Sequence, residues 1–372
     1  MSEINNTKKR IAFYIGGLCK GGAERVICNL AEYFYSIGYE VFMVTKLRDD
    51  EEYELSDGIR RIIADITPEE ETGRRLGNLK ARIDKLRKIW IDIQPDIIVS
   101  FIKKNNLMAL ASARPLKIPV IVSVRSAPAR ELSGRGVKAT SFLLFRGAAG
   151  IVLQTNEAKE YFPKYLQKKA VVLPNSINPS FLKSGMTTEE ENIEKRKQII
   201  TVGRIDDNKN QKMLVEAFSD IASLYPDWTL ELYGDGRGGN ALREYVKSIN
   251  LSDRIHFHGV VNDVPNRMKT ASIFVLPSKI EGMPNALIEA MVMGLACIST
   301  NCPCGGPRDL IDGNNGILIP VDDREALANS LRKLIDDEEL RNQMGKEASK
   351  IIHKLHPDVV NRVWQEYIES KI

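Results

Sequence analysis

The sequence lacks the long apolar segments that membrane insertion requires. No run in its 372 residues approaches the roughly 20 apolar residues that span a bilayer. The first ten residues have no apolar core behind their charges, and we therefore expect no secretory signal. With 43% hydrophobic and 27% charged residues, the composition is that of a soluble globular protein, and the length suggests two domains.

Cysteine is scarce and follows no recognisable pattern. The five cysteines are scattered, and Cys302 and Cys304 form the only close pair. Their spacing matches neither a zinc site nor a redox Cys-x-x-Cys motif. Disulfides are rare in the cytosol, so we expect ordinary reduced thiols in a cytoplasmic protein.

The usual phosphate-binding fingerprints are absent as well. There is no Gly-x-Gly-x-x-Gly and no Walker motif, which weakens the case for a dinucleotide or ATP. The basic part of the chain also has no pattern of stacking aromatic residues, and we expect no nucleic-acid partner.

Short runs rich in Ile and Val alternate with helical patterns, which predicts parallel sheets built from βαβ units. In the first half, strands are expected at Ile11–Ile15, Glu40–Thr45, Asp96–Phe101, Pro119–Val124, Gly150–Leu153 and Ala170–Leu173. In the second half they are expected at Gln198–Val202, Thr229–Tyr233, Ile255–His258, Ile273–Leu276, Ala296–Ser299 and Ile317–Ile319. The fold class is therefore α/β with two Rossmann-like domains, 1–180 and 181–356, and the polar residues 180–197 are the best linker.

Charge is unevenly distributed along the chain. Residues 1–175 carry 29 Lys and Arg against 20 Asp and Glu, whereas the remainder carries 24 against 29. Residues 72–146 alone hold 16 basic side chains and four acidic ones. Such an asymmetry points to an anionic partner for the first half.

Ligands of open α/β sheets bind beyond the carboxyl ends of the strands, so the turns that follow the predicted strands are the candidate sites. After the first strand come Gly16, Gly17, Gly21 and Gly22, where a ligand could approach the backbone and a helix N-terminus. Tight packing alone is the competing explanation for these glycines. After the first strand of the second half, Arg204 and Lys209 stand five residues apart and could straddle a diphosphate, although surface cations are usually only solvated.

Two later turns complete the set. Tyr233-Gly234-Asp235-Gly236 and the segment 257–261 could let a base or ribose lie against the backbone, but such turns are common. Glu281 lies on the loop before a helix that Pro284 begins, and Glu289 lies about one and a half turns inside that helix. A carboxylate accepts strongly from vicinal hydroxyls, so this pair suits a sugar at one end and a ribose at the other.

Together these motifs resemble the retaining glycosyltransferases of family 4, which have the GT-B fold of two Rossmann-like domains facing across a cleft. The matching segments, in the family's order, are Gly-Gly-Ala-Glu at 21–24, Pro-Asn-Ser-Ile-Asn at 174–178, Val-Gly-Arg at 202–204 with Lys209, Tyr-Gly-Asp-Gly at 233–236 and Glu-x7-Glu at 281–289. They span residues 15–320, most of the chain.

The resemblance implies a role for each matched position. Arg204 and Lys209 would hold the diphosphate, Glu281 the sugar hydroxyls and Glu289 the ribose. Further donor contacts would come from Gly16, Gly17, Gly203, Gly234, Val260, Gly282, Met283, Pro284, Asn285, Ala286 and Leu287, several of them through the backbone. Gly21, Gly22, Glu24 and Arg125 would line the cleft or contact the acceptor, and the tail helix 357–372 would pack back on the N-terminal domain.

The chain departs from the family at one position. Many members carry a histidine after the fifth strand, where this sequence has Arg125, and none of its four histidines lies in the first half. Arg125 could contact an anionic or hydroxyl-rich ligand, or form a structural ion pair. No enzyme nucleophile is evident, and similar enzymes are thought to use front-face attack assisted by the leaving phosphate. The sequence contains no Asp-x-Asp metal motif, so we expect no metal and no cofactor beyond the donor itself.

The resemblance implies transfer of a hexose or N-acetylhexosamine, by default from a UDP-sugar, to a glycan hydroxyl. Alternatives are a non-catalytic nucleotide-sugar-binding protein, or an epimerase or phosphorylase on the same fold. In the basic segment, Leu79, Ile83, Leu86, Ile89 and Trp90 interleave with Lys80, Arg82, Arg87 and Lys88 at helical spacing. This amphipathic pattern predicts peripheral binding to an anionic membrane surface through residues 72–146, with a merely solvated basic face as the alternative. The resemblance implies that this surface is the inner face of the cell membrane and that the acceptor is lipid-linked.

Overall fold

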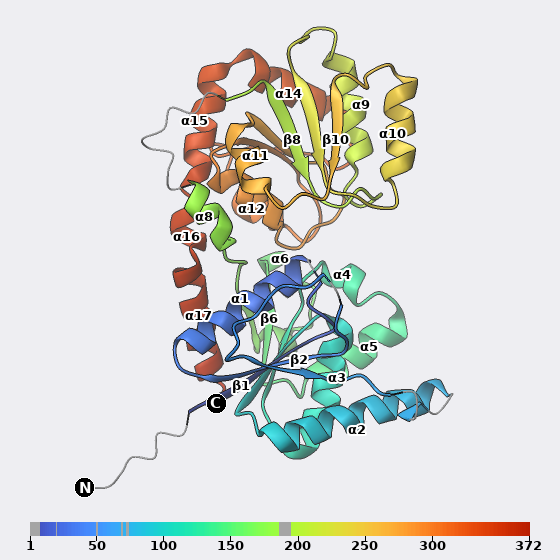
Figure 1. Cartoon of the computed structure of the whole chain (residues 1–372), viewed down its shortest axis with the longest axis vertical. Coiled ribbons are helices and arrows are strands. Elements are labelled where there is room, and N and C mark those ends of the chain that lie inside the picture. Colours follow the sequence, from blue (N-terminus) through green and yellow to red (C-terminus); the bar gives the residue numbers. More distant parts are fainter. Residues whose placement is uncertain (1–7, 20, 50, 68–69, 72–73, 186–194) are drawn as a thin grey trace, which may run out of the picture. The chain divides into compact units, whose positions relative to one another are not determined.

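The computed structural model describes residues 8–19, 21–49, 51–67, 70–71, 74–185 and 195–372. The chain forms two compact units, one of Met1–Pro174 with Val360–Ile372 and the other of Asn175–Val359. Each unit contains a parallel sheet with helices on both faces (Figure 1). The expected boundary was residue 180, and the structure instead places residues 175–180 in the second unit.

The first unit is built on a seven-stranded sheet in the order β3-β2-β1-β4-β5-β6-β7. Its strands are β1 (Arg10–Ile15), β2 (Glu40–Thr45), β3 (Arg60–Ile63), β4 (Ile97–Phe101), β5 (Val120–Ser123), β6 (Gly150–Leu153) and β7 (Ala170–Val172). Its helices are α1 (Gly22–Ser36), α2 (Arg75–Ile93), α3 (Lys103–Ala113), η2 (Arg114–Leu116), α4 (Pro128–Glu131), α5 (Arg135–Phe145), α6 (Asn156–Glu160) and α7 (Lys164–Gln167). The central strands are buried along their length, as expected for parallel strands covered on both faces.

The second unit has a six-stranded sheet in the order β10-β9-β8-β11-β12-β13. Its strands are β8 (Gln198–Val202), β9 (Thr229–Tyr233), β10 (Ile255–Gly259), β11 (Ile273–Leu276), β12 (Ala296–Thr300) and β13 (Ile317–Ile319). Its helices are α8 (Pro179–Gly185), α9 (Gln211–Ile221), α10 (Gly239–Ser248), α11 (Val264–Thr270), α12 (Asn285–Val292), α13 (Gly306–Leu310), α14 (Arg324–Asp336), α15 (Glu338–Ser349) and α16 (Ile352–Leu355). The two parallel sheets confirm the prediction of two Rossmann-like units.

In each sheet the order of the strands reverses at one point, and these two points locate the candidate sites. In the first sheet the order changes between β1 and β4, and in the second between β8 and β11. At such a switch point the connections leave on opposite faces of the sheet, and open α/β sheets bind their ligands at the carboxyl edge there. The candidate residues after β1, β8 and β11 therefore stand at switch points.

Helix α8 occupies part of the segment expected to be the linker. Residues 179–185 form this helix, which packs against α11 and α12 of the second unit. The polar sequence alone indicated a loop, but Phe181 is buried with 2% of its surface exposed, which anchors the turn. Of the rest of the expected linker, residues 186–194 lie outside the described residues.

The tail helix α17 (Pro357–Glu369) packs on the first unit beside α1 (Figure 1). The Tyr33 hydroxyl donates to Gln365 Oε1 at 2.7 Å, and Trp364 is fully buried with its ring centroid 6.0 Å from that of Phe101. The buried stripe runs through Val360, Trp364 and Ile368. Val359 and Val363, expected on the apolar side, are nearly half exposed.

Candidate active site

The site in the second unit is built where the loops after β8 and β11 meet. Asn208 joins them twice, because its side-chain amide donates to the Ile280 carbonyl at 3.1 Å and its own carbonyl accepts from Lys279 N at 2.7 Å. Asp206 shapes the first loop by accepting from the backbone N–H groups of Asn208 and Lys209 at 3.0 and 2.9 Å. Such a side-chain turn is the usual role of Asp at this kind of corner.

An ion pair between Lys209 and Glu281 is the centre of this arrangement. Lys209 Nζ lies 2.6 Å from Glu281 Oε1, and the two side chains are only 22% and 12% exposed. Sequence analysis proposed separate ligand contacts for these residues, and the structure brings them into direct contact. Arg204 differs, because its side chain is 80% exposed and its Nε lies 3.8 Å from Asp206 Oδ2. The site thus contains one cation held in place and one that extends into solvent.

Three glycines let the strand ends approach each other. Gly203 N donates to the Tyr233 carbonyl at 2.9 Å, and Gly234 N donates to the Gly259 carbonyl at 2.7 Å. A Cβ on Gly234, whose φ is +119°, would lie 2.1 Å from the Gly203 carbonyl oxygen. These glycines therefore have a structural reason that is independent of any ligand. Val260 follows directly and is 78% exposed.

The N-terminal end of α12 is held by a residue to which sequence analysis gave no role. Asn175 is buried, and its side-chain amide donates to Asn285 Oδ1 at 2.6 Å and to the Met283 carbonyl at 3.2 Å. The signal in the sequence was its place in the 174–178 motif, but its contact 110 residues away could not be read there. Pro284 precedes the helix, and the backbone N–H of Leu287 donates to its carbonyl at 3.2 Å.

Glu289 and the loop after β12 complete the surroundings of α12. Glu289 is 6% exposed within the helix. Gly306 packs so closely on the loop before α12 that a Cβ there would lie 1.7 Å from the Gly282 carbonyl oxygen. Burial raises the pKa of the nearby Cys302 thiol to about 11, and the Glu281 carboxylate adds to the shift. Cys302 is therefore a neutral thiol that packs beside the site, not a nucleophile.

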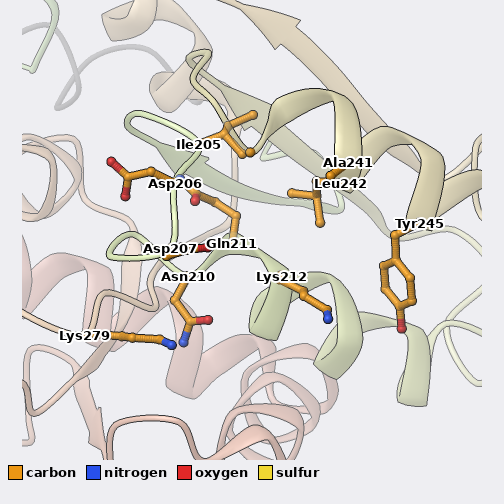
Figure 2. Close-up of a pocket in the computed structure, with 11 residues that line it drawn as sticks. Ile205, Asp206, Asp207, Asn210, Gln211, Lys212, Ala241, Leu242, Tyr245 and Lys279 are labelled. Carbon is orange, nitrogen blue, oxygen red and sulfur yellow. The ribbon is translucent and has the colours of Figure 1, made fainter.

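A pocket of about 300 Å³ borders the same loop (Figure 2). Its walls include Asp206 and Asp207 from the loop, Leu242 and Tyr245 from α10, and Lys279. Arg204, Lys209 and Glu281 do not line it. The two carboxylates are balanced by the ammonium groups of Lys212 and Lys279, so the wall carries no excess positive charge for a diphosphate, and we do not assign the donor to this pocket.

In the first unit, the glycine-rich turn after β1 is tied to its neighbours. The Gly16 carbonyl accepts from Lys46 N and Leu47 N at 3.1 Å, and a Cβ on Gly16 would lie 3.9 Å from the Asn105 side chain at the start of α3. Glu52 accepts from Leu18 N at 3.2 Å and pairs with Arg61, which lowers the pKa of Glu52.

The remaining residues of this turn lead into α1. Gly21 is the N-cap of that helix, Gly22 is its first residue, and Glu24 is the acidic residue of its first turn. A Cβ on Gly21 would lie 2.2 Å from the Glu24 carboxylate, so a larger residue there would require that flexible side chain to move. The acidic side chain favours the helix N-terminus electrostatically, which is a structural role open to Glu24.

Arg125 follows β5 and stacks on an aromatic ring. Its guanidinium carbon lies 4.7 Å from the centroid of Phe101, and Nη1 donates to Ser123 Oγ at 3.4 Å. Burial lowers the pKa of Arg125 to about 9, while Glu131 opposes the shift, so the group is charged at neutral pH. Glu131 itself accepts from Lys103 N at 2.6 Å and from the Ser126 hydroxyl at 3.0 Å. The sheet thus places Arg125 at the same edge as Gly16 and Gly17.

The basic helix α2 divides into two parts. Leu86, Ile89 and Trp90 are buried in the core, and Trp90 Nε1 donates to Ser112 Oγ at 2.8 Å. These three residues were predicted to face the membrane. That prediction is wrong for them, because they are buried in the core. The first turns are different, because Leu76 and Leu79 are 81% and 45% exposed.

The described residues contain neither a membrane-spanning helix nor a cluster of metal-ligating side chains. Among the helices of that part of the chain, none is long and apolar enough to span a membrane. Nor do those residues contain a group of three or more His, Cys, Asp or Glu side chains placed to hold a metal ion.

Comparisons with known proteins place the chain among glycosyltransferases. The model of the family described as Glycosyltransferase Family 4 matches residues 20–181, and that of Glycosyl transferases group 1 matches residues 187–351. The UDP-Gal:alpha-D-GlcNAc-diphosphoundecaprenol alpha-1,3-galactosyltransferase of Escherichia coli is 30% identical over 72% of this chain and 73% of its own length.

A second relative covers nearly the whole chain. The GalNAc-alpha-(1->4)-GalNAc-alpha-(1->3)-diNAcBac-PP-undecaprenol alpha-1,4-N-acetyl-D-galactosaminyltransferase of Campylobacter jejuni is 25% identical over 96% of this chain and 98% of its own. Among solved structures, Anabaena Alr3699/HepE in complex with UDP and glucose has a TM-score of 0.82 at 18% identity, covering 97% of this chain and all of that one. At this identity the likeness shows the fold, which is GT-B.

Proposed function

Because the chain belongs to glycosyltransferase family 4, we propose that it transfers a hexose or N-acetylhexosamine from a UDP-sugar to a glycan hydroxyl with retention of configuration. The observation that carries the proposal is the Lys209–Glu281 pair at the switch point of the second sheet, beside the N-terminus of α12. This is the place where an open α/β sheet receives its ligand.

The donor would lie along the carboxyl edge of the second sheet. Lys209 and Arg204 would contact the diphosphate, and the backbone N–H groups of Asn285 and Ala286 would meet it at the positive end of α12. Glu281 would accept from the sugar hydroxyls with the oxygen that faces away from Lys209, and Glu289 would accept from the ribose. The turn at Val260 would present its exposed backbone to the base.

Catalysis would come chiefly from stabilising the leaving diphosphate. As the glycosidic bond breaks, negative charge grows on the diphosphate while the anomeric carbon becomes oxocarbenium-like. A fixed ammonium and a guanidinium at this point stabilise that charge in the transition state. The acceptor oxygen would then attack from the same face, and the leaving phosphate would take its proton. Because the two cations supply the positive charge, we expect no metal requirement.

The acceptor would be a lipid-linked glycan. Both curated relatives described above are named for substrates linked to undecaprenol through a diphosphate. In the first unit, the edge formed by Gly16, Gly17 and Arg125 offers a half-buried cation to such an acceptor. The exposed leucines and basic residues at the start of α2 would hold the protein on the anionic inner face of the cell membrane, where lipid-linked acceptors are presented.

Product mass tests the proposal most directly. The protein is incubated with a panel of UDP- and GDP-sugars and an acceptor bearing a polyprenyl-diphosphate-linked sugar, and the acceptor is examined for the added sugar. We expect the acceptor to gain the mass of one sugar residue with one of the UDP-sugars. Hydrolysis or isomerisation of the donor in every mixture, with no change in the acceptor, would contradict a transferase.

A further inference from the structure

A second polar cluster lies on the face of the sheet formed by β9 and β10. A pocket of about 270 Å³ opens there, bordered by Glu231, Tyr233, His256 and His258. These side chains alternate along the two strands and so share one face of the sheet. The site described above does not use the side chains of Glu231, His256 or His258.

Glu231 is a buried carboxylate at the centre of the cluster. Its residue is 4% exposed, and it accepts from the Thr229 hydroxyl at 2.6 Å and from Gln198 Nε2 at 3.3 Å. His258 Nε2 lies 2.6 Å and His256 Nδ1 3.1 Å from its two oxygens. Burial raises the pKa of Glu231, but the hydrogen bonds from His258, Thr229 and His256 outweigh it and lower the pKa overall. An ionised carboxylate only accepts, so both histidine nitrogens donate.

His258 is the extra residue of a β-bulge. Phe257 pairs with Leu232 and Gly259 pairs with Tyr233, so the register skips His258. A bulge re-aims the side chain of its extra residue and bends the strand. Here the imidazole is directed at Glu231 and stacks on Tyr233, with ring centroids 4.4 Å apart and planes 9° apart. The bend is thus fixed by a charged hydrogen bond and a ring contact.

The bulge leads directly into the turn that would read the nucleotide base. Gly259 follows His258, has a φ of +65°, and its carbonyl accepts from Gly234 N at 2.7 Å. Val260, 78% exposed, comes next. His256 also contacts Glu231 but lies two residues earlier in the regularly paired strand. The two histidines therefore share a partner and differ in their connection to the turn.

We propose that His258 is a positioning residue for the donor nucleotide: its bond to Glu231 fixes the bulge and so the place of the 259–261 turn that would contact the base. This inference rests on the proposed function. It assigns His258 no contact with the substrate. Because the turn would bind the same base in the ground state and in the transition state, loosening it raises the KM for the donor and leaves kcat nearly unchanged.

Three variants test separately the two contacts of His258, its hydrogen bond to Glu231 and its ring contact with Tyr233. His258→Phe keeps an aromatic ring over Tyr233 and removes the hydrogen bond to Glu231. His258→Gln keeps a donor and removes the ring. His256→Gln, the matched control, alters a histidine on the same carboxylate outside the bulge. Each is assayed for donor KM, kcat and melting temperature, with the nucleotide sugar that the wild type uses.

We expect His258→Phe to raise the donor KM about tenfold, which is what loss of a hydrogen bond to a charged group typically costs. His258→Gln should recover most of that loss, and His256→Gln should match the wild type. An unchanged KM in His258→Phe would overturn the inference. An equal rise in donor KM in His256→Gln would also overturn it. So would a lower kcat in His258→Phe with no change in KM, accompanied by a lower melting temperature, since that would indicate only a loss of stability. A wild type that binds no nucleotide sugar would instead refute the proposed function.

Discussion

At the scale of the residue, Lys209 shows how one side chain can serve both the fold and the ligand. An ammonium group has three donors, so Lys209 can keep its bond to Glu281 while it contacts a phosphate oxygen. Glu281 would then fix the position of the cation and also accept from the sugar. Arg204 is 80% exposed and approaches Asp206 only at 3.8 Å, so its side chain can move to meet the donor.

The two cations should therefore respond differently to removal. Arg204→Ala and Lys209→Ala should each lower kcat/KM about 100- to 1,000-fold, which corresponds to a loss of about 2.7–4 kcal/mol of transition-state stabilisation. Only Lys209→Ala should also destabilise the protein, by about 1–3 kcal/mol, because it leaves the mostly buried Glu281 carboxylate without its cation. Steady-state kinetics and urea unfolding measure the two effects. Turnover near the wild-type value in both variants would rule out contact with the diphosphate.

The two carboxylates can be separated by ligand. Glu289→Ala should weaken binding of UDP itself, because that side chain would contact the ribose. Glu281→Ala should weaken binding of the complete UDP-sugar more than binding of UDP, because it removes the sugar contact in addition to the partner of Lys209. Titration calorimetry with both ligands distinguishes the roles. If Glu281→Ala reduced UDP affinity as strongly as Glu289→Ala does, the two assignments would be exchanged or wrong.

The transfer rate should not depend on a metal ion if cationic side chains take the place of one. Transfer should continue at an unchanged rate in excess EDTA, because Arg204 and Lys209 supply the charge that faces the diphosphate. The measurement is the initial rate with EDTA, with added Mn²⁺ and with neither. Loss of activity in EDTA that Mn²⁺ restores would show that a metal takes part.

At the scale of the element, α12 depends on Asn175 for the position of its first turn. Asn175→Ala would remove both side-chain bonds to Met283 and Asn285, so the loop that carries Glu281 and Pro284 would shift. We expect transfer to fall at least tenfold, since removing a buried partner leaves polar groups unsatisfied at about 1–3 kcal/mol each. The exposed Asn342 of α15 provides the control, as Asn342→Ala should change neither rate nor stability. Equal activity in the two variants would contradict this positioning role.

The elements that the sequence predicted well are those whose environment is uniform. Central parallel strands such as β4 are buried on both faces, and their unbroken Ile and Val runs reveal them. Strand β3 was missed because it lies at the sheet edge and begins with Arg60 and Arg61, so it has no apolar run. The Lys209–Glu281 ion pair and the hydrogen bond from Asn175 to Asn285 join residues far apart in sequence, and no local sequence pattern predicts such contacts.

At the scale of the whole molecule, the chain passes from one unit to the other twice, near residues 174 and 359. A backbone hydrogen bond joins the two segments that follow and precede these points. Ile177 N donates to the Leu355 carbonyl at 2.9 Å, and α17 then packs on the first unit. The last residues of the chain are thus part of the first unit's core through Trp364. The amphipathic pattern of the tail predicted a helix, while its packing partner was implied only by the family resemblance.

The proposed membrane-binding surface is smaller than the basic segment as a whole. Along α2, Lys85 pairs with Glu70 at 3.0 Å and Arg87 with Asp84 at 2.8 Å, so part of the positive charge is neutralised within the protein. The exposed apolar residues Leu76 and Leu79 lie in the first turns, next to Lys80. Insertion of these leucines would add about 1.5–3 kcal/mol each when fully buried, and each adjacent cation about 1 kcal/mol.

We therefore expect the wild type to bind anionic vesicles at low salt and to dissociate as salt is raised, because the electrostatic part is screened. A variant with Leu76→Ser, Leu79→Ser and Lys80→Glu should lose most of this binding while its affinity for the UDP-sugar is unchanged. Ile91→Ser is the matched control, since Ile91 is 53% exposed on the same helix but lies at its other end. Vesicle co-sedimentation measures all three proteins. If the wild type ignored anionic vesicles, or if Ile91→Ser weakened binding as much as the triple variant, the first turns of α2 would not be the membrane contact.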